Sequence, residues 1–349
     1  MARFFSSCSS SSTMAMLLLV GLLLPNFLIL GVQSIGVCYG RLGDNLPSPR
    51  DVINLYKANG IKSLRIYDPN HEVLDVLRDS NIEIILDFPN SLLHDLTNPW
   101  TAVTWVYANI VKYYPSVNIK YIAVGTEVSP GYNETSQVAL FLLPAMKNVQ
   151  EALRRYKLEN QIKVSTVVYC GVLASTYPPS NAVFRDDLMD FINPIIQFLV
   201  QNDNSPLLAN IYPYFAYRGD PDHVSLPFAL FTQQDPDQTG YTNLFDATLD
   251  TIYYALEKAG GGNLEVVVAE SGWPSAGGFG ATMENAETYY VNLNNHVKEG
   301  RGTPHKPGKD TQTYLFAMFD ENLKGGDETE KHFGLFYPNQ VKKYNINFN

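Results

Sequence analysis

Two glutamates end apolar segments of the kind that form buried strands, and they are the residues best placed for chemistry. Glu270 closes the segment 264–270, in which three valines precede it and a Gly-Trp-Pro sequence soon follows. Glu127 closes the segment 119–127 in the same way. A carboxylate at the end of a buried strand is costly unless it is paired or used. Two such groups facing one cavity suit the cleavage of a glycosidic bond, where one protonates the leaving oxygen and the other attacks the anomeric carbon or activates water.

A structural role is the alternative for each glutamate, because a carboxylate at the end of a strand also caps and pairs with neighbouring helix N-termini. For a single glutamate this alternative stays open. The occurrence of two, with Trp273 close to Glu270, favours the catalytic interpretation.

Segments typical of strands and of helices alternate along the chain, and this alternation predicts a single-domain (β/α)₈ TIM barrel. In such a barrel the active site lies at the carboxyl ends of the strands, where Glu127, Glu270 and Glu321 are expected together. The expected strands are 35–39, 63–68, 82–88, 119–127, 163–169, 207–214, 265–270 and 313–321, and the expected helices are 49–59, 71–80, 100–113, 136–157, 182–200, 244–259 and 284–298.

A doubly wound open sheet is the alternative fold. It is disfavoured because residues 39–43, which follow the first expected strand, have too few glycines for a dinucleotide-binding loop. No linker or shift in composition divides residues 33–349, so we expect one catalytic domain there. The stretch 218–240 is long for a loop and rich in Pro, Asp and Gln, and we expect it to form one wall of the substrate cleft.

The first 32 residues differ from the rest of the chain. Their only charged residue is Arg3, and a serine-rich stretch precedes an apolar run over residues 14–30. This pattern predicts a secretory signal peptide that is cleaved near residue 32. A membrane anchor is the alternative, but Pro25 interrupts the run and leaves it short of the ~20 residues that a span needs. We therefore expect a secreted, extracellular protein.

The charge of the chain argues against two classes of partner. The formal net charge is −10, and it becomes −11 once the leader is removed, because the leader contributes Arg3 and no acid. An acidic protein repels nucleic acid and anionic membrane surfaces, so neither is expected as a partner. We expect a monomer.

The cysteines and histidines do not form a metal-binding pattern, so no metal and no cofactor is expected. Cys38 is expected as a buried thiol, and a disulfide between Cys38 and Cys170 is disfavoured because strands one and five lie across the barrel from each other. The sequence Asn133-Glu134-Thr135 is a sequon, which predicts a glycan on Asn133 of a secreted protein.

Four aromatic residues lie beside strand ends and are expected to line a sugar-binding cleft. Aromatic faces stack on the apolar faces of sugar rings, and tyrosine hydroxyls bind sugar hydroxyls. Packing inside the barrel is the alternative for each of them. The four residues are Tyr39, Tyr67, Tyr212 and Trp273.

Several segments together resemble the plant β-1,3-glucanases of glycoside hydrolase family 17, and the similarity covers the whole chain after the leader. The segments are 264–277, 35–40, 65–69, 210–214 and 319–322. The resemblance implies a TIM barrel that cleaves internal bonds of β-1,3-glucan with retention of configuration, without a metal. The acidic pI of about 5.1 and the short C-terminal part resemble extracellular members rather than vacuolar ones. Defence against fungal walls and turnover of callose both remain open as roles.

The resemblance also assigns roles to residues. Glu270 matches the nucleophile and Glu127 the general acid/base, and a retaining enzyme holds two such carboxyl groups ~5–5.5 Å apart. Glu321 and Lys324 match residues that support the site electrostatically. For Lys324 a solvated surface position is the alternative.

Two positions depart from the family pattern. Thr126 stands where the family usually has an Asn that contacts the 2-OH of the reacting sugar, and Asp87 stands where a small residue is usual. The Thr126 side chain is shorter and carries a hydroxyl in place of amide donors. Loss of a contact worth ~2–3 kcal/mol would slow turnover ~30–150-fold. A glucan-binding protein of the same fold with weak or absent catalysis is therefore the alternative function.

Overall fold

The computed structural model describes residues 35–348, and the predicted signal peptide lies outside the described residues. Eight parallel strands close into a barrel, and each strand is paired with two neighbours. The predicted TIM barrel is thus confirmed. Around the barrel the strands follow the order β1-β10-β9-β8-β5-β4-β3-β2. Their bounds are β1 Gly36–Tyr39, β2 Ser63–Ile66, β3 Glu83–Phe88, β4 Asn118–Thr126, β5 Lys163–Tyr169, β8 Leu207–Asn210, β9 Val266–Ser271 and β10 Thr313–Leu315.

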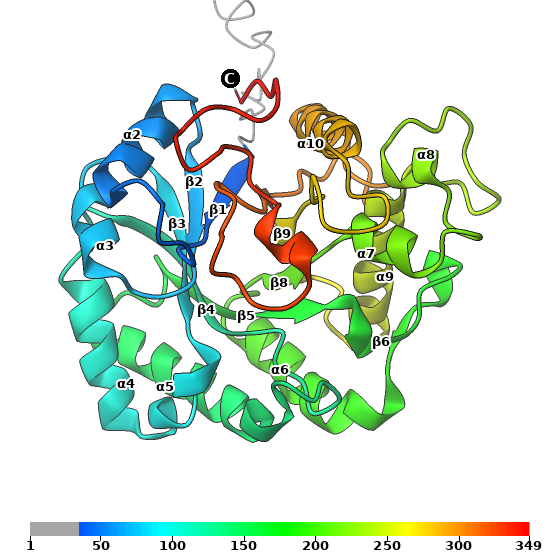
Figure 1. Cartoon of the computed structure of the whole chain (residues 1–349). Helices are drawn as coiled ribbons and strands as arrows, with labels where there is room; N and C mark the ends of the chain where they lie inside the picture. The colour runs from blue at the N-terminus through cyan, green and yellow to red at the C-terminus, as the bar shows by residue number, and fades with distance from the viewer. Residues whose placement is uncertain (1–34, 349) are drawn as a thin grey trace, which may run out of the picture. The chain divides into compact units, whose positions relative to one another are not determined.

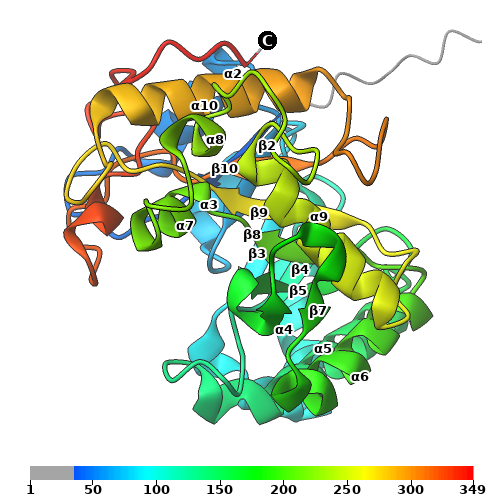
Figure 2. The ribbon, with the colours of Figure 1, turned by 90° about the vertical axis from the view of Figure 1, so that its right-hand side faces the viewer.

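Helices surround these strands and follow one another around the barrel in chain order (Figure 1). The two views agree that α5 and α6 lie side by side and that α10 lies on the other side of the barrel (Figure 2). The main helices are α2 Pro49–Ala58, α3 His71–Leu77, α4 Pro99–Val106, α5 Ala139–Arg155, α6 Met189–Gln201, α9 Leu244–Lys258 and α10 Met283–Lys298. Among residues 35–348, none of the helices is both long and apolar enough to cross a membrane.

Local sequence signals explain where several helices begin. The Ser48 hydroxyl accepts a hydrogen bond from the backbone N–H of Asp51, and Pro49 occupies the first turn of α2. Asn243 caps α9 in the same way. A capping side chain satisfies a backbone N–H that has no partner inside the helix.

The alternation of side chains along the strands divides the core into two parts. Val266 and Val268 pack in the large cluster between the strands and the helices. Val267 and Ala269 pack in a separate cluster with residues of the other strands, which fills the inside of the barrel. Cys38 belongs to this inner cluster, and both Cys38 and Cys170 are free thiols. The expected burial of Cys38 is confirmed, and the disfavoured disulfide is not formed.

Several expected boundaries were wrong. The strand expected over 313–321 ends at Leu315, so Glu321 lies beyond β10 and not at its end. The strand expected over 207–214 ends at Asn210, because Pro213 starts the short helix α7 Pro213–Gly219. The helix expected over 182–200 begins only at Met189. Its first residues instead form β7 Val183–Phe184, which pairs with β6 Leu173–Ser175 in an antiparallel hairpin outside the barrel. A short apolar run does not distinguish a strand from the start of a helix.

Candidate active site

Glu270 lies near the end of β9, and both of its carboxylate oxygens accept hydrogen bonds. Oε1 accepts from the Tyr67 hydroxyl at 2.7 Å and from Nη1 of Arg65 at 2.9 Å. Oε2 accepts from the Tyr212 hydroxyl at 2.6 Å. An ionised carboxylate has only acceptors and can receive all three bonds. The surroundings of Glu270 are therefore those of a fixed, negatively charged group.

Arg65 connects this carboxylate with a second one. Its guanidinium, which is 0% exposed, donates from Nε and Nη2 to the two oxygens of Asp87 at 3.1 and 2.6 Å while Nη1 holds Glu270. Burial alone lowers the pKa of Arg65, but the combined interactions with Asp87, Tyr67 and Glu270 outweigh it and raise this pKa well above its usual value. One buried cation thus serves two carboxylates.

Glu127 follows β4 directly and has a different environment. Its Oε1 accepts one hydrogen bond, from Nδ2 of Asn210 at 2.9 Å. Burial raises the pKa of Glu127, and the nearby charge of Glu270 raises it further, while Asn210 and Arg65 act in the opposite direction. A carboxyl group with a raised pKa keeps its proton to higher pH and is suited to donate it.

Glu321 and Lys324 line the same cavity as Glu270. Glu321 is buried, accepts a hydrogen bond from the backbone N–H of Leu42 at 2.6 Å, and has a pKa raised by burial. The Lys324 ammonium lies 4.0 Å from the ring centroid of Phe316 and 3.3 Å from a carboxylate oxygen of Glu330. Lys324 is therefore a cleft residue, and the solvated surface position is not observed.

The two unusual residues, Thr126 and Asp87, contact each other. The Thr126 hydroxyl donates to Oδ2 of Asp87 at 2.9 Å and accepts from Nη2 of Arg65 at 3.0 Å. The proton of this hydroxyl is therefore used within the protein. The two departures from the family pattern belong to one arrangement around Arg65.

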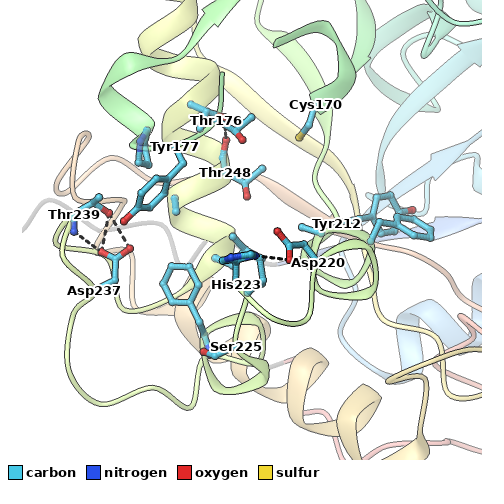
Figure 3. A pocket seen from close by; sticks show the side chains of 18 of the residues that line it. Cys170, Thr176, Tyr177, Tyr212, Asp220, His223, Ser225, Asp237, Thr239 and Thr248 are labelled. Carbon is cyan, nitrogen blue, oxygen red and sulfur yellow. Dashed lines mark hydrogen bonds and ion pairs between the residues drawn. The ribbon is translucent and has the colours of Figure 1, made fainter. Parts of the chain in front are cut away.

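Two adjoining cavities meet at the glutamates. They have volumes of about 1110 and 640 Å³, and Glu127, Tyr212 and Phe215 line both of them. Figure 3 shows the larger cavity, with Tyr212 at one end and Tyr177 at the other. The expected loop forms a wall of this cavity through residues Asp220, His223, Val224, Ser225, Phe228, Gln233, Asp237, Gln238 and Thr239. The shared lining residues make one cleft that extends to both sides of Glu127.

The aromatic residues divide into two pairs. Tyr67 and Tyr212 contact Glu270 and line the cleft as expected. Trp273 and Tyr39 do not, since they are 0% and 3% exposed. The Trp273 ring packs against Tyr217 behind the cleft, so the expectation that Trp273 and Tyr39 bind substrate is corrected to a packing role. Local sequence does not reveal which side of the strand end a ring occupies.

Arg65 and Asn210 are site residues that the sequence interpretation missed. Arg65 was nevertheless signalled by its position in an otherwise uncharged strand, because a buried charge requires a partner. Asn133 is exposed, and its glycan remains a prediction. Within the described part of the chain, no group of three or more His, Cys, Asp or Glu side chains is arranged to hold a metal ion.

A (β/α)₈ barrel whose open end holds one clamped carboxylate and one carboxyl of raised pKa has the site of a glycoside hydrolase. Comparison with known proteins agrees, because the family model for glycosyl hydrolases family 17 matches residues 35–348. The chain therefore belongs to glycosyl hydrolases family 17.

Individual relatives are similar over nearly their whole length. The acidic isoform GI9 of glucan endo-1,3-beta-glucosidase from Nicotiana tabacum is 60% identical over 335 residues, which cover 96% of this chain and 97% of the relative. A glucan endo-1,3-beta-glucosidase from Vitis vinifera is 57% identical over 337 residues, covering 95% and 96%. The structure of CJP38, a beta-1,3-glucanase and allergen of Cryptomeria japonica pollen, matches with a TM-score of 0.88 and 46% identity, covering 90% of this chain and 99% of CJP38.

Proposed function

We propose that this chain hydrolyses internal β-1,3-glucosidic bonds of β-1,3-glucans by a retaining double displacement. The observation that carries the proposal is the contrast between two carboxyl groups at one cleft. Glu270 is held by Arg65 and two tyrosine hydroxyls, and Glu127 has a raised pKa. This is the division into nucleophile and acid that the chemistry requires.

In the first step Glu127 gives its proton to the glycosidic oxygen while the Glu270 carboxylate attacks the anomeric carbon. The bond to the leaving sugar breaks, and a glycosyl ester forms on Glu270. In the second step the ionised Glu127 takes a proton from water as that water attacks the anomeric carbon. The ester bond breaks, which returns Glu270 as a carboxylate and Glu127 in its protonated form.

The cleft supports cleavage within a chain. Because cavities adjoin Glu127 on both sides, sugar units can bind before and after the bond that is broken. Relatives named glucan endo-1,3-beta-glucosidase support β-1,3-linked glucan as the substrate. We also propose that the protein acts outside the cell as a monomer, on the basis of its apolar leader and acidic composition.

The proposal predicts that the protein releases reducing ends from linear β-1,3-glucan, and that viscosity falls early because internal bonds are cut. β-1,4-Glucan is the control polymer and should stay intact. Proton NMR of the first products should show the β-anomer, as retention requires. If the protein binds the glucan but releases no more reducing ends than an inactive Glu270→Gln control, the result would instead support the glucan-binding alternative.

A pH prediction follows from the contact between Asn210 and Glu127. The Asn210 hydrogen bond lowers the pKa of Glu127, so Asn210→Ala should raise this pKa further. Because the general acid must be protonated, the fall of kcat/KM at high pH should begin at a higher pH in the variant. The measurement is the pH profile of kcat/KM on linear β-1,3-glucan.

Asn148→Ala is the matched control for this profile. In the described part of the chain the Asn148 amide donates hydrogen bonds only to the carbonyls of Leu96 and Thr97. Its profile should coincide with that of the unmodified protein. A basic limb that stays in place or moves to lower pH in Asn210→Ala would contradict the assignment of Glu127 as the acid.

A further inference from the structure

The backbone of Glu127 has a conformation that a non-glycine residue rarely adopts. Its φ angle is +55°, in the left-handed region, and Gly125 two residues earlier has a φ of +75°. Such a conformation persists only where the surrounding structure enforces it, and it is concentrated at functional sites. The contacts that hold this segment therefore determine where the Glu127 carboxyl points.

Asn90 holds the residue that precedes Glu127. Its side-chain Oδ1 accepts from the backbone N–H of Thr126 at 2.8 Å, and its Nδ2 donates to the Thr126 carbonyl at 2.8 Å. The two bonds fix both peptide groups of Thr126 from the segment that follows β3. The Glu127 N–H in turn donates to the carbonyl of Val167 on β5 at 2.8 Å.

Thr135 holds Glu127 from the other side. Its buried hydroxyl donates to the backbone carbonyl of Glu127 at 2.9 Å and accepts from the backbone N–H of Ser129 at 3.1 Å. One hydroxyl thus closes the turn 127–135 onto the glutamate itself. Together, Asn90 and Thr135 fix the main chain on both sides of the side chain that contacts Asn210.

We propose that Thr135, together with Asn90, is a positioning residue that keeps Glu127 in its left-handed conformation and so directs its proton toward the glycosidic oxygen. The inference rests on the proposed function, in which Glu127 is the acid. Without the Thr135 hydroxyl, the Glu127 carbonyl loses its side-chain donor and the backbone is free to relax toward negative φ. The carboxyl then moves away from Asn210 and from the leaving oxygen.

Thr135 has a second possible use that the experiment must separate, because it is the third residue of the sequon at Asn133. Thr135→Ser keeps both the hydroxyl and the sequon. Asn133→Gln removes only the sequon. Thr135→Val removes both and nearly preserves the shape of the side chain. Production in a bacterial host, which adds no such glycan, gives the same comparison without the sugar.

The test uses aryl β-laminaribiosides that differ only in the leaving group. A 2,4-dinitrophenolate departs without protonation, whereas a phenolate needs the acid. Thr135→Val should lower kcat/KM about 10- to 100-fold for the phenyl substrate, as expected for a small displacement of a catalytic group. It should leave kcat/KM for the dinitrophenyl substrate within about two-fold, because the acid contributes little there. Thr135→Ser and Asn133→Gln should match the unmodified protein on both substrates.

Equal losses on the two substrates, or no loss on either, would overturn the positioning role. If Thr135→Val does not fold, Asn90→Asp provides the same test, since aspartate keeps the acceptor for the Thr126 N–H and loses the donor to its carbonyl. Asn90→Asp should show the same dependence on leaving group. The proposed function fails separately, if the unmodified protein releases no reducing ends from β-1,3-glucan.

Discussion

Replacing Glu270 with Gln is expected to lower hydrolysis of linear β-1,3-glucan by about 10⁴- to 10⁶-fold, the range seen when a covalent nucleophile is removed. An amide oxygen does not form the glycosyl ester, so the first step stops. The fold should be retained, because Gln keeps an oxygen for Arg65 and Tyr67 and its NH₂ group can donate to the Tyr212 hydroxyl. Initial rates and the melting temperature of the variant measure the two effects.

Glu265→Gln is the matched control, since Glu265 is exposed and lies just before the same strand. Its rate should equal that of the unmodified protein. In Glu270→Ala, added azide should restore turnover and yield a glycosyl azide of inverted configuration, because the small anion takes the place of the missing carboxylate. A Glu270→Gln variant that retains a tenth or more of the original rate would show that Glu270 is not the nucleophile.

Replacing Arg65 with Met is expected to lower the free energy of unfolding by about 3–5 kcal/mol at neutral pH, as for other buried ion pairs that lose one partner. The variant leaves Asp87 and Glu270 buried without their cation. Burial raises the pKa of Asp87, and Arg65 opposes this rise. Without Arg65 the pKa of Asp87 in the folded protein lies further above its value in the unfolded chain. The folded protein then binds more protons than the unfolded chain at acidic pH. The loss of stability should therefore shrink as the pH falls.

The measurement is denaturant unfolding of both proteins at neutral pH and near pH 4.5. Arg218→Met is the matched control, because Arg218 pairs with Asp327 at 2.8 Å where the side chains are 35% and 67% exposed. An exposed pair of this kind contributes about 0–1 kcal/mol. Adding Asp87→Asn to Arg65→Met should recover part of the loss. Equal losses of unfolding free energy for Arg65→Met and Arg218→Met would contradict the role of Arg65 as the cation that stabilises two buried carboxylates.

The eight barrel strands could be predicted from the sequence because each is a short apolar segment and the intervals between them have the pattern of a helix. Boundaries were less predictable where an apolar run continued beyond a strand, as at residues 211–214, or preceded a helix, as at residues 182–188. At residues 211–214 a proline ended the strand, and at residues 182–188 pairing with another strand replaced the start of the helix. The sequence shows the proline but not the pairing.

The two glutamates could be predicted because a carboxylate at the end of an apolar strand is visible locally. The partners of Glu270 were not visible in this way, since Arg65 lies 205 residues from it along the chain. The same holds for Asn210, which is 83 residues from Glu127. Trp273 shows the opposite error, because its closeness to Glu270 in sequence suggested a contact with sugar that the buried ring does not allow.

The contact between Thr126 and Asp87 has a consequence for exchanging residues between this protein and its relatives. The Thr126 hydroxyl donates to a carboxylate that Arg65 also holds, so the three side chains share one set of hydrogen bonds. Changing position 126 alone alters the partner of a buried charge, and changing position 87 alone leaves a hydroxyl and a guanidinium to find new acceptors. The effects of the two exchanges will not add. Positions 87 and 126 should therefore be exchanged together or left unchanged.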